Sequence, residues 1–400
     1  MKKLIVLTSA LIVGAGALLA TRTAGSDRPA QPAMVEAVEV AAGSPAPPDT
    51  APEVRPTSTA VPLTPAKPPA GGGTPAAAAA EGPTPTEEPA VPDPPAPHTS
   101  AHPAGEAVWR HQPSGLAGNY LSDVSFADAR HGWAVGGWNG VILATDDGGE
   151  SWRRQDSGTT AELTGVSFVD RRRGWAVGFN GTILATSDGG ATWSAQASPG
   201  GDYLAVSFVD RTHGWAVGNC GVVSATTDGG ATWVGQVPPP GPLDCSRPTL
   251  TDVEFVDRDH GWAVGGDVVM ATTDGGATWV HWIVPADGLY DALFVDARRG
   301  WVVGFDTILA TTDGGASWVH VGPPLEDTAL LGVDFVHADV GWAVGATLDG
   351  RPVVLGTTDG GRSWEAEQAE PTSVLRAVAA ASPERAWAVG TAVLAREAGH

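Results

Sequence analysis

The pentapeptide GWAVG recurs along the chain and is the strongest indication of its fold. It occupies residues 132–136, 174–178, 214–218, 261–265 and 341–345, and it recurs as GWVVG at 300–304 and as AWAVG at 386–390. Seven copies of one short string, spaced 39 to 47 residues apart, indicate a repeat architecture in which each unit packs on its neighbours.

Each unit is predicted to form four short strands. In the second unit we expect strands at 163–169, 174–178, 182–186 and 191–195, separated by turns rich in Asp, Asn and Gly. Four strands in a period of about 42 residues are typical of one β-propeller blade. Residues 107–400 are therefore predicted to form an all-β, seven-bladed β-propeller.

The missing strand of the seventh unit is found at the front of the domain. The last unit stops at 393–400, before any fourth strand, whereas AVWRHQPSG at 107–115 matches ESWRRQDSG at 150–158, the fourth strand of the first full unit. We expect this N-terminal strand to complete the blade that begins at Val374. Closure of this kind removes the open edges that promote aggregation.

The segment before the propeller has a different composition. Residues 1–24 carry Lys2 and Lys3, an apolar run over 4–13 and an Ala-x-Ala site, as a secretory signal peptide does. Because apolar character continues to Ala20, an uncleaved N-terminal anchor is the alternative. Residues 25–106 contain no aromatic side chain and are predicted to be a disordered Pro/Ala/Thr-rich linker. On either reading the chain is exported, and it is expected in the periplasm, on the cell surface or outside the cell.

Charge narrows the classes of partner. The 400 residues include 45 Asp and Glu against 23 Lys and Arg, which gives a formal net charge of −22. A surface of this sign repels phosphate groups, so a nucleic-acid partner is not expected. Contact with a membrane is expected only through an N-terminal anchor.

A second signature of the form T-x-D-G-G-x-[ST]-W follows each of the first six pentapeptides. It begins at residues 145, 186, 226, 272, 311 and 357. Its aspartate is expected to accept N–H groups of its own turn, its glycines allow positive φ, and its Trp packs under the hairpin. We therefore assign a structural role to Asp147, Asp188, Asp228, Asp274, Asp313 and Asp359.

This signature resembles the Asp-box of BNR-type propellers. Together with the pattern V-x-F-V-D-x-x-x-G-W-A-V-G, it makes residues 107–400 similar to the photosystem II stability/assembly factor family and its bacterial relatives. The resemblance implies a propeller that binds partner proteins during the assembly of a complex. The long acidic linker is not part of the family pattern.

No motif of catalysis stands out. The acids Asp123, Asp252 and Asp291 are expected to line the central channel, where a glycosidase pair is one reading and an acidic, hydrated channel mouth is the favoured one. His131, His213 and His260 recur in one turn of the repeat and do not have the spacing of zinc ligands. We expect no catalytic residue, no metal and no cofactor.

One face of the propeller collects aromatic residues. Turns between second and third strands emerge on the same side as the connections between blades, and together they carry Trp138, Phe179, Phe305, Tyr120, Tyr203 and Tyr290. These rings either bind a partner or pack beneath the loops. The opposite face carries Arg171, Arg172, Arg173, Arg298 and Arg299. A basic binding patch is one interpretation of these residues, and solvated ion pairs beside turn aspartates are the favoured one.

Function is expected where the seven copies differ. They differ most in the insert at 237–248, in the second-to-third-strand turns, and at the inner-strand position assigned to Asp123, Gly165, Ala205, Asp252, Asp291, Gly332 and Arg376. The predicted partner-binding residues are Trp138, Phe179, Phe305, Tyr203 and Arg376. Cys220 and Cys245, the two cysteines of the chain, are expected to form a disulfide that pins the insert, with a metal or redox role as the weaker alternative.

The sequence thus predicts an exported, non-catalytic protein-binding module or assembly scaffold. Its partner is expected to be a protein, and an envelope complex is one place where such a partner would occur. The alternative is a carbohydrate-active propeller, either a glycan-binding module or a glycoside hydrolase.

Overall fold

The computed structural model describes residues 107–116, 118–236, 248–286 and 288–397. Over these residues the chain is built from β-strands, with one short 3-10 turn, η2 (Asn219–Gly221). Within this part of the chain, no helix is long and apolar enough to span a membrane. The predictions for 1–24 and for the linker at 25–106 lie outside the described residues.

Six sheets each contain four antiparallel strands in sequence order. Blade one contains β2 (Asp123–Phe126), β3 (Gly132–Gly136), β4 (Val141–Thr145) and β5 (Arg153–Gln155). Blade two contains β6 (Leu163–Phe168), β7 (Gly174–Gly178), β8 (Ile183–Thr186) and β9 (Ser194–Ala195). Blade three contains β10 (Tyr203–Phe208), β11 (Gly214–Gly218), β12 (Val223–Thr226) and β13 (Val234–Gln236).

The next three blades repeat this plan. Blade four contains β14 (Asp252–Phe255), β15 (Gly261–Gly265), β16 (Val268–Thr272) and β17 (Val280–Ile283). Blade five contains β18 (Leu289–Phe294), β19 (Gly300–Gly304), β20 (Thr307–Thr311) and β21 (Val319–His320). Blade six contains β22 (Thr328–His337), β23 (Val340–Thr347), β24 (Pro352–Thr357) and β25 (Glu365–Ala366).

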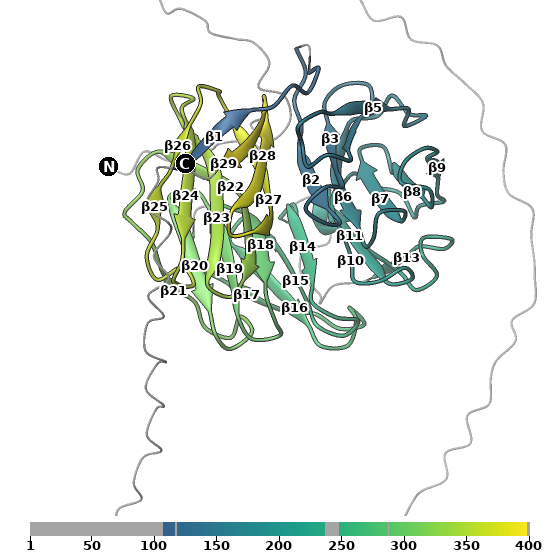
Figure 1. Cartoon of the computed structure of the whole chain (residues 1–400). Coiled ribbons are helices and arrows are strands. Elements are labelled where there is room, and N and C mark those ends of the chain that lie inside the picture. The colour runs from purple at the N-terminus through teal and green to yellow at the C-terminus, as the bar shows by residue number, and fades with distance from the viewer. Residues whose placement is uncertain (1–106, 117, 237–247, 287, 398–400) are drawn as a thin grey trace, which may run out of the picture. The chain divides into compact units, whose positions relative to one another are not determined.

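Blade seven joins the two ends of the domain. Its sheet has the order β26-β1-β29-β28-β27, formed by β1 (Val108–His111), β26 (Gln368–Ala369), β27 (Leu375–Ser382), β28 (Arg385–Gly390) and β29 (Val393–Glu397). Trp109 of β1 faces Arg396 of β29 in an antiparallel pair, and Figure 1 shows β1 beside β29. Consecutive inner strands touch around the ring, including β27 and β2. The seven-bladed propeller closed by its N-terminal strand is therefore confirmed.

The closing blade also has a fifth strand that the sequence did not predict. β26, from the connection that leaves blade six, pairs in parallel with the outer edge of β1. The predicted fourth strand of blade two, at 191–195, is reduced to β9 (Ser194–Ala195), because the turn that follows Thr186 extends through Trp193.

The recurrent residues form the contacts between blades. In blade two the ring of Phe168 stacks on Trp133 of blade one at 3.6 Å between centroids, and it meets Trp193 of its own blade edge-on at 5.9 Å. The Trp133 Nε1–H donates to the carbonyl of Gly189 in the next blade at 3.1 Å. Aromatic pairs of this geometry stabilise a fold beyond the area they bury. In this interface Trp133 stacks on the next blade, and Trp193 donates to Gln155 Oε1 of the preceding blade at 3.1 Å, so both Trp join neighbouring blades, as expected.

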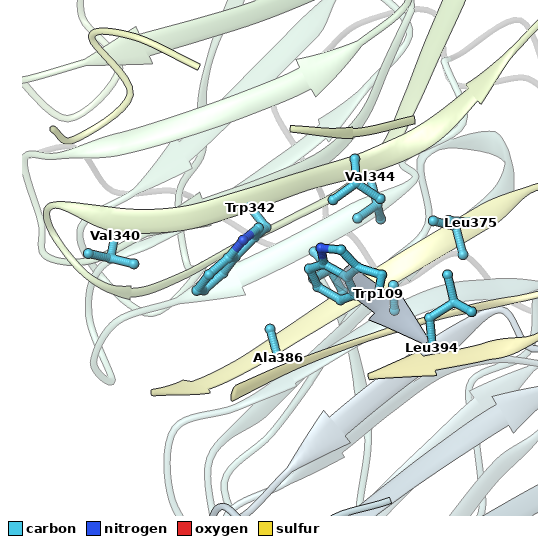
Figure 2. Packing of buried hydrophobic residues seen from close by; sticks show 10 residues of the cluster. Trp109, Val340, Trp342, Val344, Leu375, Ala386 and Leu394 are labelled. Atoms are coloured by element: carbon cyan, nitrogen blue, oxygen red, sulfur yellow. The ribbon is translucent and has the colours of Figure 1, made fainter. Parts of the chain in front are cut away.

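The interface between blades six and seven departs from this plan. Blade seven has Ala380 where the others have Phe, and Trp109 from the N-terminal strand packs edge-on against Trp342 at 6.3 Å. Figure 2 shows Trp109 and Trp342 together in this core, with Val344, Leu375 and Leu394 nearby. The N-terminal strand therefore supplies buried apolar surface as well as backbone pairing.

Candidate functional site at the channel and its mouth

The seven inner strands surround a cavity of about 440 Å³. Its wall carries one cation, Arg376, and the carboxyl groups of Asp123, Asp252, Glu254, Asp291 and Asp334. The prediction that Asp123, Asp252 and Asp291 line the channel is confirmed. Glu254 and Asp334 were missed, although they occupy the place of Ser125, Ser167 and Ser207 in the other units, which a comparison of the copies could have found.

Four of the five wall carboxylates bridge adjacent blades by accepting backbone N–H groups. An innermost strand pairs with its second strand on one side only, so its other edge presents unpaired N–H groups. Four such groups, from Val166, Ala292, Val333 and Ala380, donate to Asp123, Asp252, Asp291 and Asp334 of the preceding blade at 2.7, 3.1, 2.7 and 2.7 Å. Ser125, Ser167 and Ser207 accept equivalent N–H groups at 3.1 to 3.2 Å. These wall residues therefore satisfy the backbone of the ring.

Burial changes the protonation of this wall. It raises the pKa of Asp123 and of Asp334 to about 7. Burial also raises the pKa of Glu254, as do the charges of Asp252 and Asp334. Asp252 and Asp291 are hydrogen-bonded to each other, and burial raises the pKa of both carboxyls. The channel therefore carries less negative charge near neutral pH than its five acids suggest.

The Asp252–Asp291 pair does not match the geometry of glycoside hydrolysis. Retaining glycosidases keep their two carboxyl groups about 5 Å apart and inverting enzymes keep them farther apart, so that the sugar fits between them. Asp252 and Asp291 are instead in hydrogen-bond contact. Across the described ranges, no group of three or more His, Cys, Asp and Glu side chains is arranged to hold a metal ion.

A cluster of aromatic and charged groups lies at one mouth of the channel. The Tyr120 hydroxyl donates to Glu162 Oε1 at 2.5 Å, and the guanidinium carbon of Arg376 lies 4.8 Å from the centre of the Tyr120 ring. Trp138 meets Tyr120 edge-on at 6.5 Å and is 55% exposed. Burial and Glu162 raise the pKa of Tyr120, and burial lowers that of Arg376. We call Tyr120, Trp138, Glu162 and Arg376 the mouth cluster.

Local hydrogen bonds present Trp138 to solvent. The Asn119 side chain accepts the Trp138 N–H at 3.1 Å and donates to the Trp138 carbonyl at 3.3 Å. Asn119 belongs to the connection before blade one and Trp138 to the turn between β3 and β4, so the two kinds of loop share one face, as expected. These bonds hold the backbone of Trp138, and the edge-on contact with Tyr120 positions its ring.

The five predicted binding residues do not all lie at the surface. Trp138 is exposed, Phe179 and Phe305 are half-buried in equivalent turns, and Arg376 lies in the channel wall. The prediction for Tyr203 is wrong, because this side chain is fully buried and its hydroxyl bonds to Ser224 Oγ at 2.9 Å. Tyr203 occupies the core position that Leu163, Leu289, Leu330 and Leu375 fill in other blades, and this pattern of Leu was the signal that could have corrected it.

The register assigned to Arg376 was also wrong by one residue. Asp123 pairs with Val135, and the residue of blade seven that pairs with the equivalent Val389 is Ala377. An irregularity between Leu375 and Ala377 adds the extra residue. Arg376 therefore stands at this irregularity, where Thr164 and Tyr290 stand in blades two and five.

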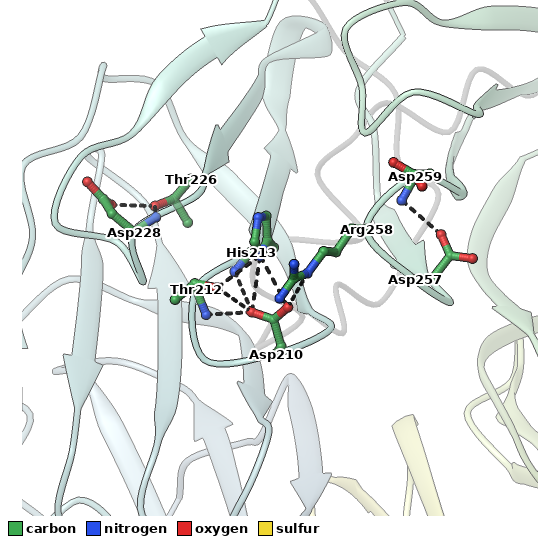
Figure 3. A network of polar contacts seen from close by, with 8 residues as sticks. All are labelled: Asp210, Thr212, His213, Thr226, Asp228, Asp257, Arg258 and Asp259. Carbon is green, nitrogen blue, oxygen red and sulfur yellow. Dashed lines mark hydrogen bonds and ion pairs between the residues drawn. The ribbon is translucent and has the colours of Figure 1, made fainter.

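The opposite face is occupied by its own turn contacts. Asp210 accepts the N–H groups of Thr212 and His213 at 2.7 and 3.0 Å, and it pairs with Arg258 of the next blade at 2.7 Å. Figure 3 shows this network. His131, His213 and His260 each contact the aspartate three residues earlier, so they belong to the repeat as predicted. Exposed pairs of this kind contribute little free energy.

The six aspartates of the second signature are engaged within their own turns. In the first turn Asp147 accepts the Ser151 N–H at 3.0 Å and its hydroxyl at 2.5 Å, and Thr145 donates to Asp147 at 2.7 Å. Although burial acts in the opposite direction, these hydrogen bonds lower the pKa of Asp147 to about 2. The other five turns repeat the contacts, which agrees with a structural role. For the predicted disulfide, Cys220 lies in η2, but Cys245 lies outside the described residues, so the pairing stays a prediction.

The fold and its site define a seven-bladed propeller with an acidic channel and the mouth cluster at one of its ends. The sequence profile of the family described as photosynthesis system II assembly factor YCF48 matches residues 151–233, 242–322 and 283–368, more than half of the chain. The chain therefore belongs to this family. A comparison with curated protein sequences finds no match.

Solved structures agree on the fold. A structure titled "YCF48 bound to D1 peptide" is 22% identical, with a TM-score of 0.58, and the alignment covers 73% of this chain and 95% of that one. YCF48 from Cyanidioschyzon merolae is 20% identical, with a TM-score of 0.58 and coverage of 72% and 98%. A streptogramin B lyase is 10% identical, with a TM-score of 0.63 and coverage of 73% and 97%.

Proposed function

We propose that this chain is an exported, non-catalytic assembly scaffold whose propeller binds a peptide segment of a partner protein at the mouth cluster. Membership of the YCF48 family supports a protein-binding scaffold of the photosystem II assembly factor type. The structure titled "YCF48 bound to D1 peptide" supports a peptide as the ligand. An envelope complex is the setting we propose, because the first 24 residues have the pattern of an export signal.

The mouth cluster is the observation that carries this proposal. The repeat needs the core residues of every blade, but it needs no exposed Trp, since the equivalent turns of blades four and six have none. A half-exposed Trp beside a Tyr and an Arg has the composition of a binding hot spot. Four of the five wall carboxylates accept backbone N–H groups, which supports binding rather than hydrolysis.

The test compares the two faces of the propeller in the full-length protein. Partners captured from the exported fraction of the host are identified, and the affinity of the main partner is measured for Trp138→Ala and for Arg172→Ala on the opposite face. We expect Trp138→Ala to weaken binding about tenfold or more while the melting temperature stays within a few degrees. Arg172→Ala should change neither.

Two other results would contradict the proposal. Loss of binding in Arg172→Ala alone would place the partner on the other face. Specific binding on a glycan array, or turnover in a glycosidase panel, would favour the carbohydrate-active alternative. Fractionation of the host and sequencing of the mature N-terminus test export.

A further inference from the structure

The outer rim of three consecutive blades is apolar. Among the described residues, the exposed large apolar side chains are Trp138, Leu348, Val234, Val280, Ile283 and Val319. The last four lie on the fourth strands of blades three, four and five and are 58% to 75% exposed. We call these four residues the rim patch. Three of these residues occupy the same repeat position in consecutive blades, and two of the four lie on one strand, β17.

The repeat supplies an internal control for this patch. Val234, Val280 and Val319 each follow the Trp that ends the second signature. At the same place blades one, two, six and seven have Arg153, Ser194, Glu365 and Arg110, all exposed. Polar side chains therefore satisfy the fold at this position, and the three valines are not required for folding.

The backbone at the centre of the patch is open to pairing. β17 is longer than the fourth strands β5, β9, β13, β21 and β25. It pairs with β16, and no other described strand pairs with its outer edge. Edge strands are usually protected by charge or by a covering segment, but β17 has the sequence VHWI. Its outer edge therefore has both backbone groups that no described strand pairs and the exposed apolar side chains of Val280 and Ile283.

The same molecule shows how such an edge is covered. In blade seven the fourth strand β1 is paired on its outer edge by β26, and the Glu370 N–H donates to the Trp109 carbonyl at 2.8 Å. The blade plan therefore accepts a fifth strand at the rim. β1 carries charged residues and is covered, whereas β17 is apolar and is not covered by any described strand.

We propose that the outer edge of β17 binds an extended, apolar segment of a second partner protein, which adds as a fifth strand and covers the rim patch. A second copy of this chain is disfavoured, because two chains of net charge −22 repel each other. A lipid surface is disfavoured, because hydrocarbon cannot satisfy the unpaired backbone groups of β17. Strand addition satisfies both the backbone and the side chains.

The experiment uses a photo-crosslinking amino acid in the full-length protein in its host. Val280→p-benzoylphenylalanine and Val319→p-benzoylphenylalanine probe the patch, and Arg153→p-benzoylphenylalanine probes the matched position of blade one. We expect the first two to crosslink to one apolar segment of a single partner and the third to crosslink several times less. Equal labelling at all three, or products that contain only lipid or a second copy of this chain, would overturn the proposal.

A second measurement tests strand addition itself. A synthetic peptide with the sequence of the crosslinked segment should slow hydrogen exchange of the amides of 280–283 about tenfold or more. Val280→Arg and Val319→Glu, which place residues from blades one and six at the same position, should abolish this protection without lowering the melting temperature. Trp138→Ala should leave it unchanged, so failure here is distinct from failure of the channel-mouth proposal. Protection elsewhere, with none at 280–283, would refute the added strand.

Discussion

The interface between blades six and seven differs from the other six interfaces of the ring. In those six, a Trp of one blade stacks on a Phe of the next at 3.5 to 3.8 Å. In the closing interface Trp342 meets Trp109 edge-on, and the guanidinium carbon of Arg396 lies 5.1 Å from the centre of the Trp342 ring. A buried pair of Arg396 with Glu367 at 3.0 Å completes this contact.

The two kinds of interface use different pairs of small and large residues. In a regular blade the first Gly of the pentapeptide lies under the Phe ring, and a Cβ on Gly174 would lie 2.4 Å from the ring of Phe168. In blade seven the Phe is Ala380, and the residue opposite it is Ala386 instead of Gly. The change from GWAVG to AWAVG is therefore a consequence of the lost ring. Trp109 of β1, a strand from the other end of the domain, fills the space beside Trp342.

The largest effect is expected when the closing strand is removed. A chain that begins at residue 118 loses β1 and Trp109, whose truncation to Ala alone costs about 3–5 kcal/mol in a core, and it leaves the Arg396–Glu367 pair open to water. We expect it to unfold at a much lower temperature or to aggregate. A chain that begins at residue 100 keeps the strand and should melt like the full protein. Equal melting temperatures for the two would refute the closure.

The buried ion pair should separate the two kinds of interface next. Glu367→Ala leaves the buried Arg396 without its carboxylate and removes the acceptor of the Trp109 Nε1–H, for which we expect a loss of about 3–5 kcal/mol. The matched change in a regular blade, Gln155→Ala, removes neutral hydrogen bonds to Gly189 and Trp193 and should cost about 1–2 kcal/mol. Urea unfolding measures both. Equal losses would mean that the pair has no special role in closure.

The repeat made the fold predictable, and the departures from it marked where prediction failed. The spacing of the pentapeptide gave the blade count, and the match of 107–115 to 150–158 gave the closing strand, since both depend on recurrence. Tyr203 was misplaced because the three Tyr near the connections do not share one register position. Tyr120 precedes the core residue Leu121, Tyr290 follows the core residue Leu289, and Tyr203 itself occupies the core position. Side-chain exposure at a strand end depends on register, and one inserted residue changes it.

The channel was predictable in kind but not in chemistry. Asp123, Asp252 and Asp291 could be aligned, but their N–H partners belong to the next blade and become visible only once the ring is built. The mouth cluster depends on Glu162 at the end of a connection and on Arg376 at an irregularity of β27. Both positions recur in the other blades, but the residue types there differ from blade to blade, so the repeat pattern did not mark Glu162 or Arg376.

Exchanging the small residues tests whether they follow the Phe ring. Gly174→Ala places a methyl group against Phe168 and should destabilise the propeller by about 1–3 kcal/mol. Ala386→Gly in the closing blade meets no ring and should cost about 1 kcal/mol, close to the value of one buried methyl group. Thermal melts of the two variants measure the difference. If the two variants lose the same free energy of unfolding, the Phe ring is not the reason for the glycine at the start of the pentapeptide.

The smallest difference between the two interfaces is expected at the channel wall, where the closing blade is regular. Asp334 accepts the N–H of Ala380 in blade seven, and Asp123 accepts the N–H of Val166 in blade two, both at 2.7 Å. Burial raises the pKa of each of these carboxyls from 3.8 to about 7. A carboxyl whose pKa rises on folding gives stability that is complete below the unfolded pKa and is lost as pH rises through about 7. The melting temperature should therefore rise as pH falls from 8 to 5, until protonation of Asp147 and the other turn aspartates reverses the trend at lower pH. Asp123→Asn and Asp334→Asn should each flatten this rise by the same few degrees, and unequal slopes would show that the closing blade differs at its inner edge as well.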